Sequence, residues 1–234
     1  MSESAKKRLF VALDMPSAAE AEAMVARLGS DVVAYKIGLE LLFGGGLALA
    51  QRLKSEAKSV FLDMKLLDIP NTVEKTAANV AGLGLDYLTV HGTDRKTLDA
   101  AVRGRGNSAM KLLAVTVLTS LDGLDLVEQG IQGTTPAKLV VRRALMAKAA
   151  GFDGVIASGM EAADVRAAVG PSFLIVTPGI RLKAGVDKDQ ARVVKPTDAI
   201  KSGATHLVVG RPITGAGDPG AVARQIVQEI RSKM

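Results

Sequence analysis

Lysine and aspartate alternate at the ends of short apolar runs in the first third of this sequence. Asp63 and Lys65 are separated by one residue, and Asp68 follows three residues after Lys65. Lys36 and Asp14 lie at the ends of two earlier runs. Opposite charges interleaved in a poorly solvated site keep one another ionised, and such an array can stabilise a reacting anion without reorganising. A structural ion pair explains any single pair, but charges from three consecutive runs favour a functional site.

Arginine and glycine form a second group in the last third of the chain. Arg181 closes the segment Thr-Pro-Gly-Ile-Arg after one apolar run, and Gly210 and Arg211 follow another. Arginine makes forked hydrogen bonds to phosphate oxygens, and glycine lets the backbone approach an oxyanion closely. These residues predict a phosphate site, with a glycine turn beside surface arginines as the alternative.

Several further residues have two interpretations on the sequence alone. Segment 182–195 is long and charged, so it is either a mobile lid over a phosphate or a solvated loop. Thr119 offers a hydroxyl after the fifth apolar run, where an ordinary turn is the alternative. We expect His91 to be a hydrogen-bonded core residue and His206 to be structural.

Eight short apolar runs position these residues. Most are apolar at nearly every position, which is typical of parallel strands buried on both faces. The runs are Leu9–Leu13, Val32–Ile37, Val60–Lys65, Tyr87–Val90, Leu112–Leu118, Gly154–Ile156, Phe173–Val176 and His206–Val209.

Longer stretches of helical composition separate the runs. Several show an apolar stripe, and Ser17 and Thr135 stand where helix N-caps belong. Five glycines occupy predicted C-terminal caps: Gly82, Gly104, Gly151, Gly170 and Gly203. The predicted helices include Ala18–Leu28, Leu47–Ala57, Val73–Gly82, Lys96–Val102, Pro136–Ala150 and Pro219–Lys233.

The alternation of eight strands and helices predicts an α/β fold, a (β/α)8 TIM barrel. We expect one domain over residues 1–234, with residues 1–7 as a flexible tail. An open doubly wound sheet would place a glycine-rich G-x-G-x-x-G turn after the first strand, where the sequence instead reads Asp14-Met-Pro-Ser. In a barrel, residues at the carboxyl ends of strands surround the active site. Since residues i and i+2 of a strand share a face, Asp63 and Lys65 should both point into the mouth.

Composition excludes several other classes of protein. The sequence lacks cysteine and has two histidines, which excludes a disulfide scaffold or thiolate metal site and argues against a multi-histidine metal site. The net charge of +6 is scattered, without an aromatic-rich basic stripe, so nucleic acid is not an expected partner. Without a secretory signal or an apolar run long enough to span a membrane, we expect a cytoplasmic protein.

The segment from Asp63 to Thr72, Asp-Met-Lys-Leu-Leu-Asp-Ile-Pro-Asn-Thr, resembles the D-x-K-x-x-D-I-P-N-T signature of the orotidine 5'-phosphate decarboxylase family. Shorter similarities follow in order over nearly the whole chain. They are Val-Ala-Leu-Asp14, Tyr-Lys36-Ile-Gly, Leu-Thr-Val-His91-Gly, Val-Thr-Val-Leu-Thr119-Ser, Thr-Pro-Gly-Ile-Arg181 and Val-Val-Gly210-Arg211-Pro-Ile.

The resemblance implies a homodimeric barrel that converts orotidine 5'-monophosphate to UMP and carbon dioxide, the last step of de novo pyrimidine synthesis, with neither cofactor nor metal. It implies a charged array of Lys36, Asp63 and Lys65, with Asp68 and Thr72 contributed by the partner subunit. The implied substrate contacts are Asp14 and Lys36 to the ribose, Thr119 to the pyrimidine, and Gln190, Gly210 and Arg211 to the phosphate, with Arg181 nearby.

Two other functions stay open. Mg²⁺-dependent decarboxylases and aldolases of sugar phosphates share the D-x-K-x-x-D pattern, but they bind the metal partly through an acidic residue at the end of the second strand. Lys36 stands there in this chain, and its charge would repel a metal ion. A non-catalytic nucleotide-binding protein would have no need for Asp63 and Lys65 side by side.

Overall fold

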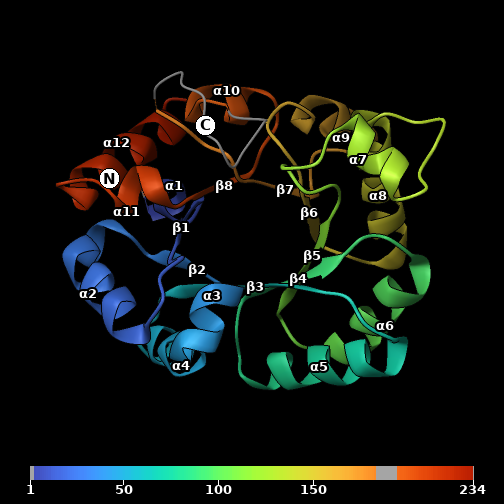
Figure 1. The fold of residues 1–234 in the computed structure, drawn as a ribbon. Helices are drawn as coiled ribbons and strands as arrows, with labels where there is room; N and C mark the ends of the chain where they lie inside the picture. The colour runs from blue at the N-terminus through green and yellow to red at the C-terminus, as the bar shows by residue number, and fades with distance from the viewer. Residues whose placement is uncertain (1–2, 183–193, 234) are drawn as a thin grey trace.

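Eight parallel strands close into a barrel in the computed structural model, which describes residues 3–182 and 194–233 (Figure 1). Each strand pairs with the next along the chain, and β8 pairs with β1. This closure confirms the predicted barrel and excludes the open doubly wound sheet. The strands are β1 Leu9–Ala12, β2 Ala34–Gly38, β3 Ser59–Leu66, β4 Tyr87–His91, β5 Lys111–Val115, β6 Gly154–Ile156, β7 Leu174–Thr177 and β8 His206–Val209.

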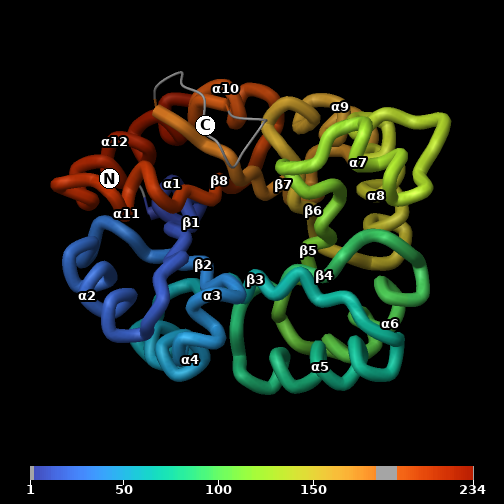
Figure 2. The backbone as a smooth tube through the Cα atoms, in the orientation of Figure 1, coloured from blue at the N-terminus to red at the C-terminus, as the bar shows by residue number. Residues whose placement is uncertain are grey.

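The helices form a ring outside the barrel, and the chain passes around this ring in sequence order (Figure 2). The longer helices are α2 Ala18–Leu28, α4 Leu47–Ser55, α5 Pro70–Gly82, α6 Arg95–Arg105, α8 Pro136–Ala150, α9 Ala162–Val169 and α12 Pro219–Arg231. Short helices and turns occupy several connections. They are α1 Glu3–Lys6, the 3₁₀ turn η1 Gly29–Asp31, α3 Leu39–Leu41, the π turn η2 Leu42–Gly46, α7 Gly123–Glu128, α10 Pro196–Lys201 and α11 Arg211–Thr214.

The start of the chain differs from the expected flexible tail over residues 1–7. Glu3–Lys6 form the helical turn α1, which packs on α12. Ala5 is fully buried in this contact. Burial of one small apolar side chain between polar neighbours therefore orders residues that composition alone assigns to a tail.

Most of the predicted helix caps are present. Ser17 and Thr135 each accept a hydrogen bond of 3.3 Å from the backbone N–H three residues later. Gly151, Gly170 and Gly203 adopt positive φ angles of 90°, 80° and 101° at or just after helix ends. Glycine adopts this backbone region without the steric cost that a side chain would bring.

Gly104 is not a cap, contrary to the prediction. It lies inside α6, whose cap is Gly106, and a Cβ atom on Gly104 would lie 2.1 Å from the carbonyl oxygen of Glu74 in α5. The glycine therefore permits close contact between the two helices. Gly82 is likewise the last residue of α5, and the positive φ after this helix belongs to Gly84.

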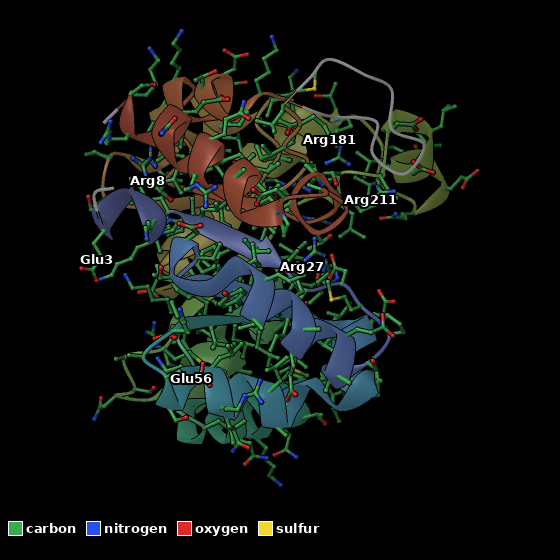
Figure 3. All side chains as sticks on the ribbon, turned by 90° about the vertical axis from the view of Figure 1, so that its left-hand side faces the viewer. Glu3, Arg8, Arg27, Glu56, Arg181 and Arg211 are labelled. Carbon is green, nitrogen blue, oxygen red and sulfur yellow. The ribbon has the colours of Figure 1, made fainter. Side chains whose placement is uncertain are left out.

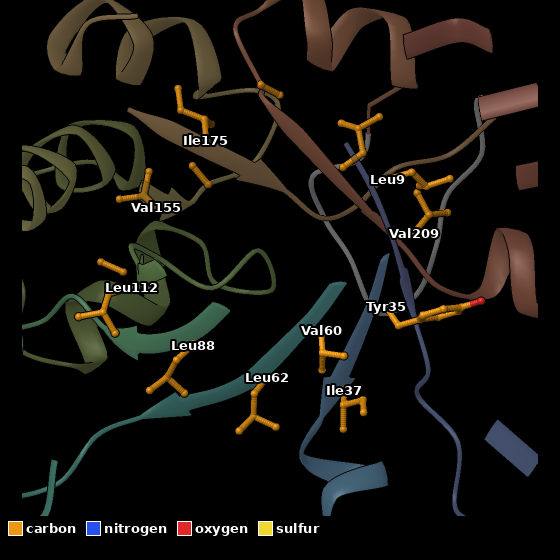
Figure 4. Close-up of a cluster of buried hydrophobic side chains, with 14 of the residues drawn as sticks. Leu9, Tyr35, Ile37, Val60, Leu62, Leu88, Leu112, Val155, Ile175 and Val209 are labelled. Carbon is orange, nitrogen blue, oxygen red and sulfur yellow. The ribbon is translucent and has the colours of Figure 1, made fainter. Parts of the chain in front are cut away.

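The barrel has an aliphatic layer outside and an aromatic cluster inside. Alternate strand residues, including Leu62, Leu88 and Val209, point outward into the layer between strands and helices (Figure 4). Inside, at the amino ends of the strands, Phe10 packs edge-on against Tyr87 at 5.1 Å and stacks on His206 at 5.5 Å. These rings fill one end of the barrel, consistent with a structural place for His206.

Three polar residues each join the start of one strand to the start of the strand before it. Asp86, Asp153 and Thr205 stand just before β4, β6 and β8. Each side chain accepts a hydrogen bond from a backbone N–H in the second residue of the preceding strand, at 2.7, 2.9 and 2.9 Å respectively. The barrel therefore repeats one side-chain contact over β3–β4, β5–β6 and β7–β8.

Candidate active site

A cavity of about 560 Å³ opens at the carboxyl ends of the strands. Figure 3 shows Arg181 and Arg211 near each other at this end of the molecule and Arg8, which precedes β1, at the other. Arg181 and Arg211 both line the cavity. The barrel thus brings together the residues that follow separate strands, as the TIM-barrel prediction requires.

The charged side chains from β1, β2 and β3 form one connected network. Lys36 Nζ lies 2.6 Å from Asp14 Oδ1 and 3.6 Å from Asp63 Oδ2. Lys65 Nζ lies 2.8 Å from the same Asp63 oxygen. All four residues line the cavity, so positive and negative groups alternate along its wall.

Burial differs along the network. Lys36 and Asp63 are 7% and 8% exposed, whereas Lys65 is half-buried. Burial acts to raise the pKa of Asp63, but the positive charges of Lys36 and Lys65 and hydrogen bonds from Lys65 and Thr89 outweigh it and lower that pKa. Asp63 is therefore held as a carboxylate between two ammonium groups.

The backbone of β3 is irregular where this network begins. Leu62 pairs with Leu88 of β4, and the next pair joins Leu66 to Val90, so three residues of β3 face one residue of β4. Lys65 has a φ of +48°, a left-handed conformation that is uncommon for a residue with a side chain. The contact between Asp63 and Lys65 therefore forms across a bulge, and not along a straight strand with regularly alternating side chains.

Gly38 is a part of the site that sequence reasoning missed. It ends β2 beside Asp63, and a Cβ atom there would lie 2.9 Å from Lys36 Nζ and 3.2 Å from Asp14 Oδ1. The absence of a side chain therefore leaves room for the Lys36–Asp14 pair. The signal available in the sequence is a glycine two residues after the lysine, on the same strand face.

The wall contributed by β5 and β6 is apolar. Val115, Val117 and Ile156 line the cavity, and Thr119 lies at its rim. One part of the cavity thus offers paired charges and another offers hydrocarbon with a single hydroxyl. A planar heterocycle with a charged substituent fits this division of polarity.

Gly210 and Arg211 lie at the end of β8, where Gly210 immediately precedes the short helix α11. Arg181 follows β7, and its backbone N–H donates to Val194 O at 3.0 Å. A parallel bridge joins Ile180 to Val194, so the two ends of segment 182–195 lie together beside the cavity. Gln190 and the rest of the predicted lid, residues 183–193, lie outside the described residues.

Known proteins are similar to this chain over nearly its full length. Residues 7–226 match the family described as Orotidine 5'-phosphate decarboxylase / HUMPS family. The chain belongs to this family.

Individual relatives of the decarboxylase family are similar over nearly their whole length. An orotidine 5'-phosphate decarboxylase of Methylobacterium sp. (strain 4-46) is 54% identical over 228 residues, 96% of each protein. That of Methylorubrum populi is 52% identical over 234 residues, 99% of this chain and 100% of the relative. The crystal structure of orotidine 5'-phosphate decarboxylase from Lactobacillus acidophilus has a TM-score of 0.84 and 36% identity, covering 95% of this chain and 98% of its own.

Two residues of the decarboxylase-family signature stand apart from the cavity in the single chain. Asp68 is exposed, and its carboxylate accepts a hydrogen bond of 2.7 Å from the N–H of Ile69. Thr72 lies in the first turn of α5. Neither of them lines the cavity, so the fold of one chain brings together Lys36, Asp63 and Lys65 but not Asp68.

His91 ends β4 near this network without lining the cavity. Burial lowers its pKa, with further lowering by the positive charges of Arg143 and Lys65. The imidazole is therefore neutral at pH 7. His91 is partly exposed, and its expected place as a hydrogen-bonded core residue stays a prediction.

The described part of the chain contains no group of three histidine or acidic side chains placed to hold a metal ion. Within residues 3–182 and 194–233, no helix has both the length and the apolar character needed to cross a bilayer.

Proposed function

We propose that this chain decarboxylates orotidine 5'-monophosphate to UMP and carbon dioxide, with Lys65 as the proton donor. The observation that carries the proposal is the ammonium of Lys65, 2.8 Å from the Asp63 carboxylate in the cavity that Arg181 and Arg211 also line. The decarboxylase family to which the chain belongs supports the choice of substrate.

The chemistry needs a cation beside carbon 6 of the pyrimidine. Loss of carbon dioxide from that carbon leaves a vinylic carbanion with little delocalisation. The ammonium of Lys65 stabilises this charge and then donates the proton that replaces the carboxylate, acting as general acid. Lys65 suits both tasks because it is half-buried and already ion-paired.

Asp63 and Lys36 hold Lys65 in place. Asp63 contacts both ammonium groups through the same oxygen, so the carboxylate orients the proton donor. Placed beside the substrate carboxylate, Asp63 also raises the energy of the ground state, and this repulsion is relieved as carbon dioxide leaves. Asp14 and Lys36 form the adjacent pair that would bind the ribose hydroxyls, and Thr119 would contact the pyrimidine.

The phosphate would bind at Arg181, Gly210 and Arg211. Guanidinium groups form paired hydrogen bonds with phosphate oxygens, and both arginines line the cavity. Binding energy gained at a group that takes no part in the bond changes can be used to fix the base against Lys65. Gln190 is proposed as a further phosphate contact from the family resemblance alone.

We propose that the reaction uses no metal ion and no cofactor. Lys36 supports this because its ammonium stands at the end of β2, where a Mg²⁺-dependent relative would require an acidic ligand. The test is an ultraviolet assay of orotidine 5'-monophosphate in excess EDTA. Turnover under these conditions supports the proposal, whereas turnover that returns only with added Mg²⁺ would favour the sugar-phosphate class of enzyme.

We propose a homodimer in which Asp68 and Thr72 enter the partner's cavity. Asp68 is exposed beside two apolar side chains, Leu67 at 54% and Ile69 at 67% exposure. Phe43 is 86% exposed in η2 after β2, the strand next to β3. Exposed apolar groups clustered at neighbouring strand ends are typical of a surface covered by another protein. A cytoplasmic location stays a prediction.

A further inference from the structure

Thr89 is a buried hydroxyl beneath the charged network, and the sequence analysis gave it no role. It lies in the middle of β4, is 0% exposed and does not line the cavity. Its Oγ1 lies 2.9 Å from the backbone nitrogen of Lys65 and 2.8 Å from Asp63 Oδ1. One hydroxyl therefore contacts both residues on which the proposed reaction depends.

The direction of these two hydrogen bonds follows from chemistry. The backbone N–H of Lys65 is a donor, so it occupies a lone pair of the hydroxyl oxygen. The single hydroxyl hydrogen is then directed to the Asp63 carboxylate, which only accepts when ionised. Thr89 thus links the backbone of the proton donor to the side chain of its ion-pair partner.

The bulge in β3 explains why this link is needed. Residues 63–65 face Thr89 alone, between the pairs formed by Leu62 and Leu66. The Lys65 N–H uses the Thr89 side chain as its acceptor in place of a backbone carbonyl. This bond accompanies the left-handed backbone of Lys65, at φ +48°, a conformation that the surroundings must hold in place.

The Asp63 carboxylate is fixed at both oxygens as a result. Thr89 donates to Oδ1, and Lys65 Nζ contacts Oδ2 at 2.8 Å. A carboxylate held at one oxygen only can rotate about its terminal bond, whose torsional preference is weak. Because Thr89 holds Oδ1, the other oxygen, Oδ2, which accepts the hydrogen bond from the Lys65 ammonium, has one position.

We infer that Thr89 is a positioning residue for the decarboxylation: its hydroxyl sets the backbone of Lys65 and the carboxylate plane of Asp63, and so the place of the proton donor. This inference rests on the proposed function. It assigns Thr89 no contact with the substrate, because the side chain is buried behind the cavity wall.

The test compares Thr89→Val, which keeps the shape and removes the hydroxyl, with Thr89→Ser, which keeps the hydroxyl. Thr89→Val should lower kcat about 10²-fold, the cost of a small misplacement of a reacting group. Its Kd for UMP should stay within about threefold of wild type, since the phosphate and base contacts are intact. Thr89→Ser should keep kcat within about tenfold of wild type.

The pH profile gives a second readout. Without the Thr89 hydrogen bond, the pKa of Asp63 should rise, since that bond favours the carboxylate. The acidic limb of kcat/KM should therefore move to higher pH in Thr89→Val and stay in place in Thr89→Ser. Thr205→Val is the matched control, because it removes a hydroxyl that joins β7 to β8 at the far end of the barrel. It should leave kcat and the pH profile unchanged.

The outcomes separate this inference from the proposed function. Wild-type enzyme that forms no UMP would overturn the proposed function itself. An active wild type with a folded Thr89→Val that keeps its kcat and pH profile would overturn the role of Thr89 alone. If Thr89→Val does not fold, Thr89→Ser decides: activity near wild type supports the role, and a loss of about 10²-fold overturns it.

Discussion

The Lys36 ammonium and the α-carbon of Gly38 lie so close that a methyl group on the glycine would be 2.9 Å from the Lys36 nitrogen. The flexible end of the lysine side chain would have to move, and it would leave the position where it contacts both Asp14 and Asp63. A small change of the backbone residue therefore alters the charge network directly.

Gly38→Ala should fold as wild type does and lose activity. The displaced ammonium no longer supports Asp63, so kcat/KM should fall about tenfold or more. Gly82→Ala is the control, because Gly82 ends α5 with open space around its α-carbon. Equal activity of Gly38→Ala and Gly82→Ala, with both chains folded by circular dichroism, would contradict the role given to this contact.

Lys65→Ala should nearly abolish formation of UMP. It removes the proposed general acid, worth about 10²–10⁴-fold by itself, together with the cation beside the carbanion. The loss of orotidine absorbance measures the rate. Lys96→Ala, at an exposed position in the first turn of α6, should keep full activity. Substantial turnover by Lys65→Ala would remove this residue from the role of proton donor.

Arg211→Ala should weaken the reaction of the nucleotide far more than that of the bare nucleoside. A charge-assisted hydrogen bond contributes about 1.5–3 kcal/mol, so kcat/KM for orotidine 5'-monophosphate should fall about 10–100-fold. For orotidine itself, which has no phosphate, the change should be small. Equal losses for both substrates would place the phosphate elsewhere.

Mixing Lys65→Ala chains with Asp68→Ala chains should restore activity. If Asp68 acts in the partner's cavity, each hybrid dimer contains one site with both residues intact. Statistical pairing then returns about one quarter of the wild-type activity. Subunit exchange is verified by native mass spectrometry. No recovery despite proven exchange would mean that Asp68 does not act across an interface.

Acid should destabilise the fold partly through His206. Burial, followed by the charges of Arg8 and Lys111, lowers the pKa of this residue from 6.5 to about 4. Between these values the unfolded chain binds a proton that the folded chain does not, so the free energy of unfolding falls as the pH falls. The slope is at most about 1.4 kcal/mol per pH unit.

His206→Phe keeps an aromatic ring beside Phe10 and removes this titration. Urea unfolding at pH 7 and pH 4.5 should therefore show a smaller loss of stability for the variant than for wild type. The same pH dependence in both proteins would assign the acid sensitivity to the carboxylates instead.

The strands and the charged cluster could be predicted from the sequence, since buried parallel strands are apolar throughout and a charge at their ends is conspicuous. The sequence does not predict short helices such as α7 and α11, because segments of four to six residues do not show a helical period. The strand β2 begins at Ala34 and not at Val32, because residues 32 and 33 connect the turn η1 to the strand and Ala34 is the first residue that pairs with β3.

The bulge in β3 could not be predicted, and it changes the reason why Asp63 and Lys65 meet. Alternation along a strand correctly predicts that both side chains face the mouth. The positive φ of Lys65 and its bond to Thr89 depend on the register between β3 and β4, which local sequence does not specify. The prediction that Gly104 is a helix cap is wrong for a similar reason, because the sequence of α6 alone does not show its contact with α5.

Asp86 joins, at the amino end of the barrel, the two strands that carry Asp63 and Thr89. It fastens the start of β4 to the second residue of β3, and Thr89 and Asp63 lie three residues further along those same two strands. The pairing of the two strands is therefore fixed from the amino end up to Leu62 and Leu88, where the bulge that places Asp63 and Lys65 against Thr89 begins. A carboxylate that does not line the cavity thus fixes the register from which the bulge begins.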